Sequence, residues 1–74
     1  MAEKIKIIGD GKWFEVLGNR EGLIGLAIMC LQLAMLPEDD AAAGKLGNHH
    51  HYDPSMNNAE DGSLEMTITY KPDL

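Results

Sequence analysis

Hydrophobic and polar residues alternate near the start of this 74-residue chain, which predicts two paired strands. The runs Ile5–Ile8 and Trp13–Val16 flank Asp10-Gly11, a dipeptide that favours a hairpin because both of its residues tolerate positive φ. A two-residue loop at this dipeptide predicts the cross-strand pairs Ile8–Trp13, Ile7–Phe14, Lys6–Glu15 and Ile5–Val16. One face of the hairpin is therefore apolar, and the other carries an opposite-charge pair.

A long apolar run follows and predicts a helix from about Arg20 to Leu36. Asn19 is a good N-cap, and Pro37 stops the helix. Only Gly25 and Gln32 interrupt the apolar run after Leu23, so the helix is apolar nearly all round and needs more cover than one sheet face provides. The run is shorter than the roughly 20 residues of a membrane span. We therefore expect no membrane insertion.

The second half of the chain predicts two further strands. Residues 37–47 indicate an acidic turn with one helical turn closed by Gly44, and a strand then covers His49–Asp53. A long loop occupies residues 54–62, and the last strand alternates from Leu64 to Tyr70. The order β-β-α-β-β predicts a single α+β domain over residues 1–74, a four-stranded mostly antiparallel sheet with one helix packed on one face. In the predicted core, strand side chains pack against helix side chains. The strand residues are Ile5, Ile7, Phe14, Val16, Leu64, Met66, Ile68 and Tyr70, and the helix residues are Leu23, Leu26, Ala27, Cys30 and Ala34.

The formal net charge of −6 lies entirely in the second half of the chain. Residues 37–74 hold two lysines against eight acidic residues, whereas residues 1–36 are balanced. An acidic chain lacks the clustered Lys and Arg that grip phosphates, so we expect no nucleic-acid partner. The acidic half is either a solvated surface or a patch that steers a basic protein partner.

The single cysteine, Cys30, excludes an internal disulfide and fits a reducing compartment, so we expect a cytoplasmic protein. Its apolar neighbours indicate a small core side chain rather than a reactive thiol. Ser55 and Ser63 match no nucleophile motif, and no glycine-rich phosphate loop follows a strand. We therefore expect no enzyme activity and no cofactor.

The densest group of chemically capable side chains is His49, His51 and Asp53, which would share one face of a strand. Two imidazoles and a carboxylate are zinc-type ligands, but successive side chains on that face lie about 7 Å apart. A tetrahedral site also usually draws on a second element, and no other histidine is available outside this run. We expect no native metal here.

Three segments resemble a known family of small bacterial proteins. They are Gly18-Asn19-Arg20-Glu21-Gly22-Leu23 at the helix start, His49-His50-His51-Tyr52-Asp53-Pro54, and Glu60-Asp61-Gly62-Ser63-Leu64-Glu65 before the alternating last strand. Their order and spacing over about residues 16–70 are similar to those of the immunity protein 32 family. The resemblance implies neutralisation of a toxin of a bacterial polymorphic toxin system by direct binding.

If the resemblance holds, the chain binds and blocks a cognate protein toxin through a rigid, complementary surface. The residues that we expect to contact the toxin are His49, His51, Asp53, Glu60 and Asp61. Two other classes stay open. One is a small metal-binding protein that uses the strand from His49 to Asp53, and the other is a self-assembling structural domain.

The excess of apolar surface on the helix predicts a homodimer. A domain of this size is only marginally stable alone, and a two-fold interface covers the same patch on both subunits. The residues that we expect at this interface are Ile24, Ile28, Leu31 and Met35 on the helix, with Trp13 on the sheet as a second choice.

Overall fold

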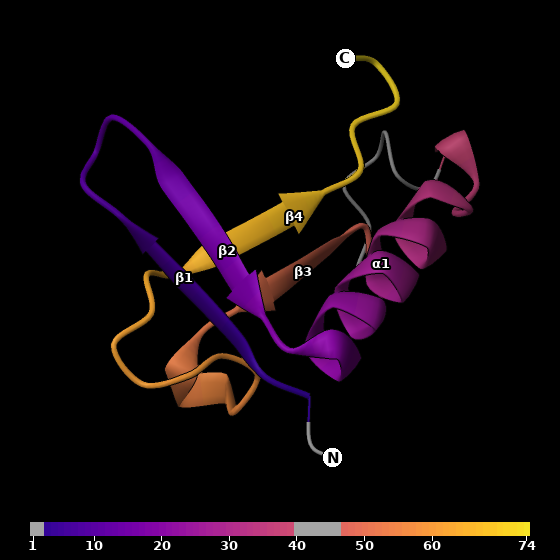
Figure 1. The fold of residues 1–74 in the computed structure, drawn as a ribbon. Coiled ribbons are helices and arrows are strands. Elements are labelled where there is room, and N and C mark those ends of the chain that lie inside the picture. The colour runs from indigo at the N-terminus through magenta and orange to yellow at the C-terminus, as the bar shows by residue number, and fades with distance from the viewer. Residues whose placement is uncertain (1–2, 40–46) are drawn as a thin grey trace.

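The protein is described by a computed structural model that places residues 3–39 and 47–74. In chain order its elements are β1 (Ile5–Gly9), β2 (Phe14–Gly18), α1 (Arg20–Ala34), β3 (His49–Tyr52), the 3-10 helix η1 (Pro54–Met56) and β4 (Met66–Thr69) (Figure 1). The expected order of strands and helix is thus confirmed. The predicted helical turn closed by Gly44 falls within residues 40–46, outside the described residues.

The four strands form two separate antiparallel sheets, β1–β2 and β3–β4, so the predicted single sheet is wrong. The free edge of β1 is taken by the loop before β4. The carbonyl oxygens of Ile5 and Ile7 accept from the backbone N–H groups of Glu60 (2.7 Å) and Leu64 (2.8 Å). The Ile7 N–H donates to Ser63 Oγ at 3.2 Å. Because this loop occupies the edge, β4 begins only at Met66 and pairs with β3 alone.

The turn of the first hairpin is wider than predicted. Asp10 Oδ1 accepts from the backbone N–H groups of Lys12 (3.0 Å) and Trp13 (3.3 Å), which gives a four-residue loop rather than two. Ile7 therefore lies opposite Val16, and the expected pair of Lys6 with Glu15 is not formed. The pairing differs from the predicted one by two residues, and an even shift keeps each side chain on its predicted face.

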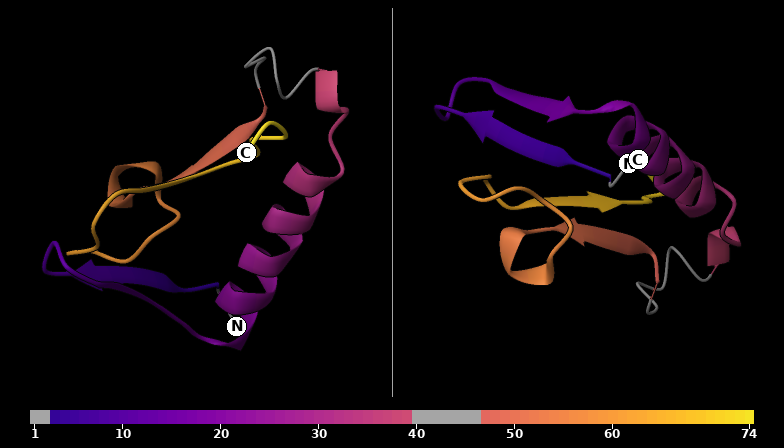
Figure 2. Two further views of the ribbon diagram at one scale, coloured as in Figure 1. Left: turned by 90° about the horizontal axis from the view of Figure 1, so that it is seen from above. Right: turned by 60° about the horizontal axis from the view of Figure 1, so that its bottom comes forward.

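The start of α1 is tied to the chain before β1. Asn19 Oδ1 accepts from the Gly22 N–H (2.8 Å) and the Lys4 N–H (3.0 Å), and the Asn19 N–H donates to the Lys4 carbonyl (3.2 Å). Asn19 is therefore the N-cap, as predicted, and its hydrogen bonds also join the helix start to the segment before β1. From this point α1 runs from the first sheet to the second (Figure 2).

The buried face of α1 differs from the predicted face by about one residue step around the helix. Gly22 and Leu33 are buried, and Leu26 and Met29 are half-buried. Gly22 sets this rotation, because its backbone lies against the Lys4 carbonyl group and leaves no room for a side chain. Four predicted core residues are consequently exposed: Leu23, Ala27, Cys30 and Ala34.

The core lies where the two sheets face each other. Its buried side chains are Ile5, Ile7 and Tyr52, with Val16, Leu26, Ala59, Met66 and Ile68 packed around them. Phe14 and Leu64 were predicted here but are 67% and 46% exposed. Phe14 lies at the turn end of the hairpin, and Leu64 lies on the segment that covers the edge of β1.

Candidate protein-binding surface

The two faces of β3 have different environments. His49 and His51 are exposed, and their rings meet edge to face with centroids 4.8 Å apart. Each ring is also held from the side, since His49 Nδ1 lies 2.8 Å from Asn48 Oδ1 and His51 Nδ1 lies 2.8 Å from Thr67 Oγ1. The imidazoles of both residues are therefore fixed on a surface, which suits contact with a partner.

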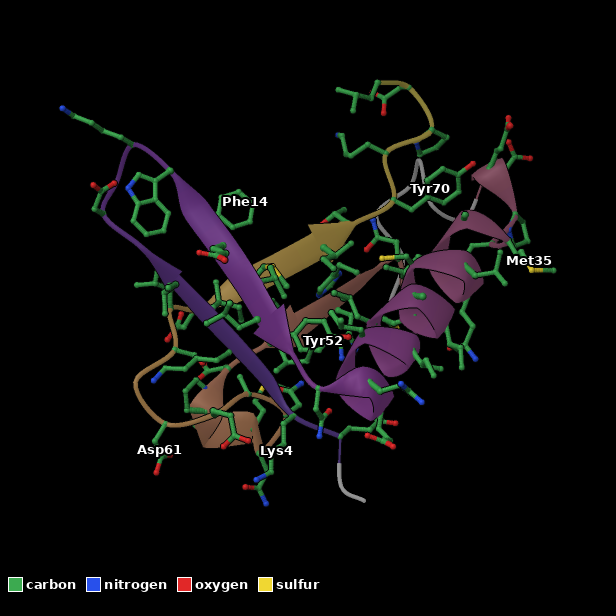
Figure 3. The ribbon with its side chains drawn as sticks, viewed as in Figure 1. Lys4, Phe14, Met35, Tyr52, Asp61 and Tyr70 are labelled. Carbon is green, nitrogen blue, oxygen red and sulfur yellow. The ribbon has the colours of Figure 1, made fainter. Side chains whose placement is uncertain are left out.

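Tyr52 belongs to the opposite face of β3, together with His50, and points into the core (Figure 3). Burial raises the pKa of the Tyr52 hydroxyl above its usual value of 10.0, and the nearby Cys30 and Glu3 add to this shift. The Tyr52 side chain packs in the core with Ile5 and Ile7 of β1, so it anchors β3 to β1. The strand that exposes His51 on one face is thus fixed by core packing of Tyr52 on its other face.

Asp53 follows β3, which ends at Tyr52, and is the N-cap of η1. Asp53 Oδ1 accepts from the Ser55 N–H at 2.9 Å, which caps the 3-10 helix. Asn58 closes the loop behind it, because Asn58 Oδ1 accepts from the Asp53 N–H (2.8 Å) and Asn58 Nδ2 donates to the His51 carbonyl (2.6 Å). The loop expected over residues 54–62 therefore contains an ordered turn that fixes the Asp53 carboxylate.

A hollow of about 290 Å³ lies between the end of β3, η1 and the start of β4. Its lining residues are His51, Tyr52, Asp53, Met56, Glu65, Met66 and Thr67. We call this the His51 hollow. Two carboxylates and no Lys or Arg line it, and Met56 is 56% exposed at its rim. The hollow therefore suits a cationic side chain flanked by an apolar one.

Glu60 and Asp61 line a second hollow of about 290 Å³, on another side of η1, with Pro54, Asn57 and Asn58. Lys4 also lines this hollow, and Figure 3 shows Lys4 and Asp61 at the same edge of the molecule. Glu60 further lies beside Lys4 and Lys6 in an adjoining hollow. Four of the five expected partner residues are thus divided between two neighbouring hollows, and the fifth, His49, lines neither of them.

The ligand set of the metal-binding alternative is not assembled. Asp53 Oδ1 is engaged by the cap of η1, and His51 Nδ1 faces Thr67. Among residues 3–39 and 47–74 no group of three or more His, Cys, Asp or Glu side chains has the arrangement of a metal site. No observation therefore favours this alternative over a binding surface.

Glu65 and Met56 of the His51 hollow were not predicted as site residues. The alternation of the last strand places Glu65 on the same face as Thr67, but the register of β3 with β4 was needed to bring that face beside His51. Met56 belongs to residues 54–62, which the sequence predicts to be a loop. In the structure Met56 lies in η1, and this short helix places its side chain at the His51 hollow. No pattern in the sequence indicates this location.

A family model described as immunity protein 32 matches residues 14–71, which extend from the start of β2 to just beyond β4. The match therefore includes every residue of the His51 hollow. It also includes Glu60 and Asp61 of the second hollow, whose third acidic residue, Glu3, lies outside the match. No curated protein and no solved structure matches the chain. Within the residues that are placed, no helix is long and apolar enough to cross a membrane.

Proposed function

The chain belongs to the immunity protein 32 family, and from this premise we propose that it binds a cognate protein toxin and blocks it without catalysis. The observation that carries the proposal is the family match over residues 14–71. Blocking by occlusion requires a rigid, complementary surface and no reacting group, so inhibition needs no chemical step.

We propose the His51 hollow as the centre of the toxin-binding surface, with Glu60 and Asp61 at its periphery. Its rigidity supports this choice, because Asn58 and the Asp53 cap fix one wall and the sheet pairing of His51 with Thr67 fixes another. Partners that meet preformed surfaces lose little conformational entropy on binding.

The chemistry of the hollow favours a basic segment of the toxin. Asp53 and Glu65 offer carboxylates to an Arg or Lys side chain, and Met56 can adapt to an apolar neighbour. Lys4 and Lys6 lie beside Glu60 rather than beside Glu65, so no lysine lining the His51 hollow offsets its two carboxylates. A toxin loop with one inserted Arg or Lys matches this arrangement.

Co-expression in a bacterial host tests the function. The probe is the toxin domain encoded directly upstream of this chain's gene, produced with and without the chain. We expect growth only when the chain is present, and we expect a purified complex of the two proteins. Failure of the chain to protect cells or to bind this domain would refute the proposed pairing.

The surface is tested by Glu65→Lys, which reverses a charge in the hollow at an exposed position. We expect this variant to weaken binding by more than about tenfold. The matched control is Glu15→Lys, the same change at an exposed position of β2 away from the hollow. Equal effects of both variants would show that net charge, and not the His51 hollow, governs binding.

Electrostatic steering gives the same surface a kinetic signature. If the acidic side chains attract a basic toxin, the association rate falls steeply between about 0.05 and 0.5 M salt while the dissociation rate changes little. In the Glu65→Lys variant we expect the association rate to fall less with added salt than in the unmodified protein. A flat association rate in the unmodified protein would exclude steering.

A further inference from the structure

One face of α1 is apolar and has no partner within the described chain. Ile24, Ile28, Leu31 and Met35 are 53%, 50%, 61% and 75% exposed. Their spacing of four, three and four residues places them in a single row along the helix, and we call this row the helix seam. Figure 3 shows Met35 at the end of this row, pointing away from both sheets.

The neighbouring positions widen the apolar surface without adding charge. Leu23, Ala27, Cys30 and Ala34 are also exposed and lie along one side of the helix seam. On the other side are Gly25 and Gln32, which are uncharged. Between Gly22 and Ala34 the helix therefore carries no charge at all, in a chain whose net charge is −6.

The chain exposes more surface than a compact monomer of its mass. A compact monomer of 8.1 kDa exposes about 4,500 Å², whereas this chain exposes 5489 Å². Its radius of gyration is 13.2 Å, compared with about 11 Å for a compact chain of this length. The excess of roughly 1,000 Å² is a total over all residues, and the exposed helix seam is one part of it. A standard interface takes roughly 800 Å² from each partner, so the excess is large enough to contain one.

We infer that the helix seam binds the same seam of a second copy of this chain, in an antiparallel two-fold dimer. The seam is self-complementary in this orientation. Ile24 lies opposite the partner's Met35, and Ile28 lies opposite the partner's Leu31, so each seam residue meets an apolar counterpart. A two-fold axis between Ile28 and Leu31 generates both contacts at once and closes the assembly.

The charges at the two ends of α1 select the antiparallel orientation. At the start of the helix Arg20 is exposed and the adjacent Glu21 is half-buried, whereas the exposed acidic residues Glu38 and Asp39 follow the helix end. An antiparallel pair brings Arg20 near the partner's acidic end twice, and it also opposes the two helix dipoles. A parallel pair would instead bring the acidic ends of both copies together.

The dimer leaves the proposed toxin-binding surface open. The His51 hollow is built by β3, η1 and β4, and η1 lies on the opposite side of the molecule from α1 (Figures 1 and 2). Trp13 lies in the turn of the first hairpin, remote from α1, so it takes no part in the helix contact. Dimerisation and toxin binding can therefore be measured separately.

Sedimentation equilibrium of the untagged chain at micromolar concentration tests the dimer. We expect twice the chain mass of 8.1 kDa. We expect Leu31→Glu to raise the dissociation constant by more than about tenfold. Met35→Glu, at the most exposed seam position, provides a second variant that disturbs the fold less. The control is Met56→Glu, which changes an apolar residue that is 56% exposed and lies outside the seam, and it should leave the dimer intact.

Disulfide trapping tests the orientation, in a Cys30→Ser background. Mixing the Ile24→Cys and Met35→Cys chains should give mainly the mixed disulfide, because the antiparallel pair places these two positions opposite each other. A wild-type chain that sediments at 8.1 kDa, or a folded Leu31→Glu variant that stays dimeric, would overturn the proposal. Disulfides formed only between identical chains would overturn the antiparallel arrangement.

Discussion

The backbone of Gly22 in α1 lies directly against the backbone of Lys4, which precedes β1, and a Cβ at residue 22 would overlap the Lys4 carbonyl. Exposed helix positions usually gain stability from a Gly→Ala change, by about 1 kcal/mol. We expect the opposite at this position. Gly22→Ala should lower the free energy of unfolding by roughly 1–3 kcal/mol, because rigid backbone must move.

Gly25→Ala is the matched control for this prediction. A Cβ at residue 25 would lie 2.6 Å from Glu3 Oε2, which is the end of a flexible side chain that can turn away. We expect this variant to be neutral or slightly more stable. Urea unfolding of both variants at one protein concentration decides the matter, and similar effects at the two glycines would contradict the close contact with Lys4.

Asn19→Ala should destabilise the protein by about 1–2 kcal/mol, since it removes the acceptor for both the Gly22 and the Lys4 N–H groups. Asn19→Asp keeps an acceptor oxygen at the same place and should retain more of this stability. Urea unfolding measures both variants. Equal losses in the two would show that the N-cap acceptor is unimportant here.

The raised pKa of Tyr52 predicts a loss of stability in base. Because the pKa is higher in the folded than in the unfolded chain, the contribution of the Tyr52 hydroxyl is complete below pH 10.0 and is lost as the pH rises through the folded value. We expect the difference in unfolding free energy between wild type and Tyr52→Phe to change with pH only above this point. A difference spectrum at alkaline pH that places the Tyr52 pKa at or below 10.0 would contradict this prediction.

We also expect no stoichiometric metal on His49, His51 and Asp53. The Asp53 carboxylate caps η1, and a zinc site would need it to turn toward the histidines. Elemental analysis of untagged protein, purified without a metal column, is the measurement. One zinc per chain that is lost on His51→Ala would overturn this expectation.

The local features of the fold were predictable because they depend on neighbours in sequence. Asn19 caps α1 as expected, since a side chain with an acceptor oxygen satisfies the helix N–H groups two or three residues ahead. Alternation in the last strand places Met66 and Ile68 toward the core and Thr67 toward solvent, because successive strand residues face opposite sides. The resemblance to the immunity protein 32 family was also confirmed. It could be found from the sequence alone because it depends on short motifs in a fixed order.

Only the tertiary structure decided how these elements meet. Leu23 and Cys30 are as apolar as Leu26 and Met29, so the apolar pattern of α1 contains no preferred inner face, and the contact of Gly22 with Lys4 chose one. The edge of β1 binds the segment before β4 rather than β4 itself, which divides the expected sheet in two. The His51 hollow depends on the second outcome, because β4 then pairs with β3 alone and brings Thr67 beside His51. Backbone hydrogen bonds are alike for any strand, so the choice between partners rests on packing across the whole chain.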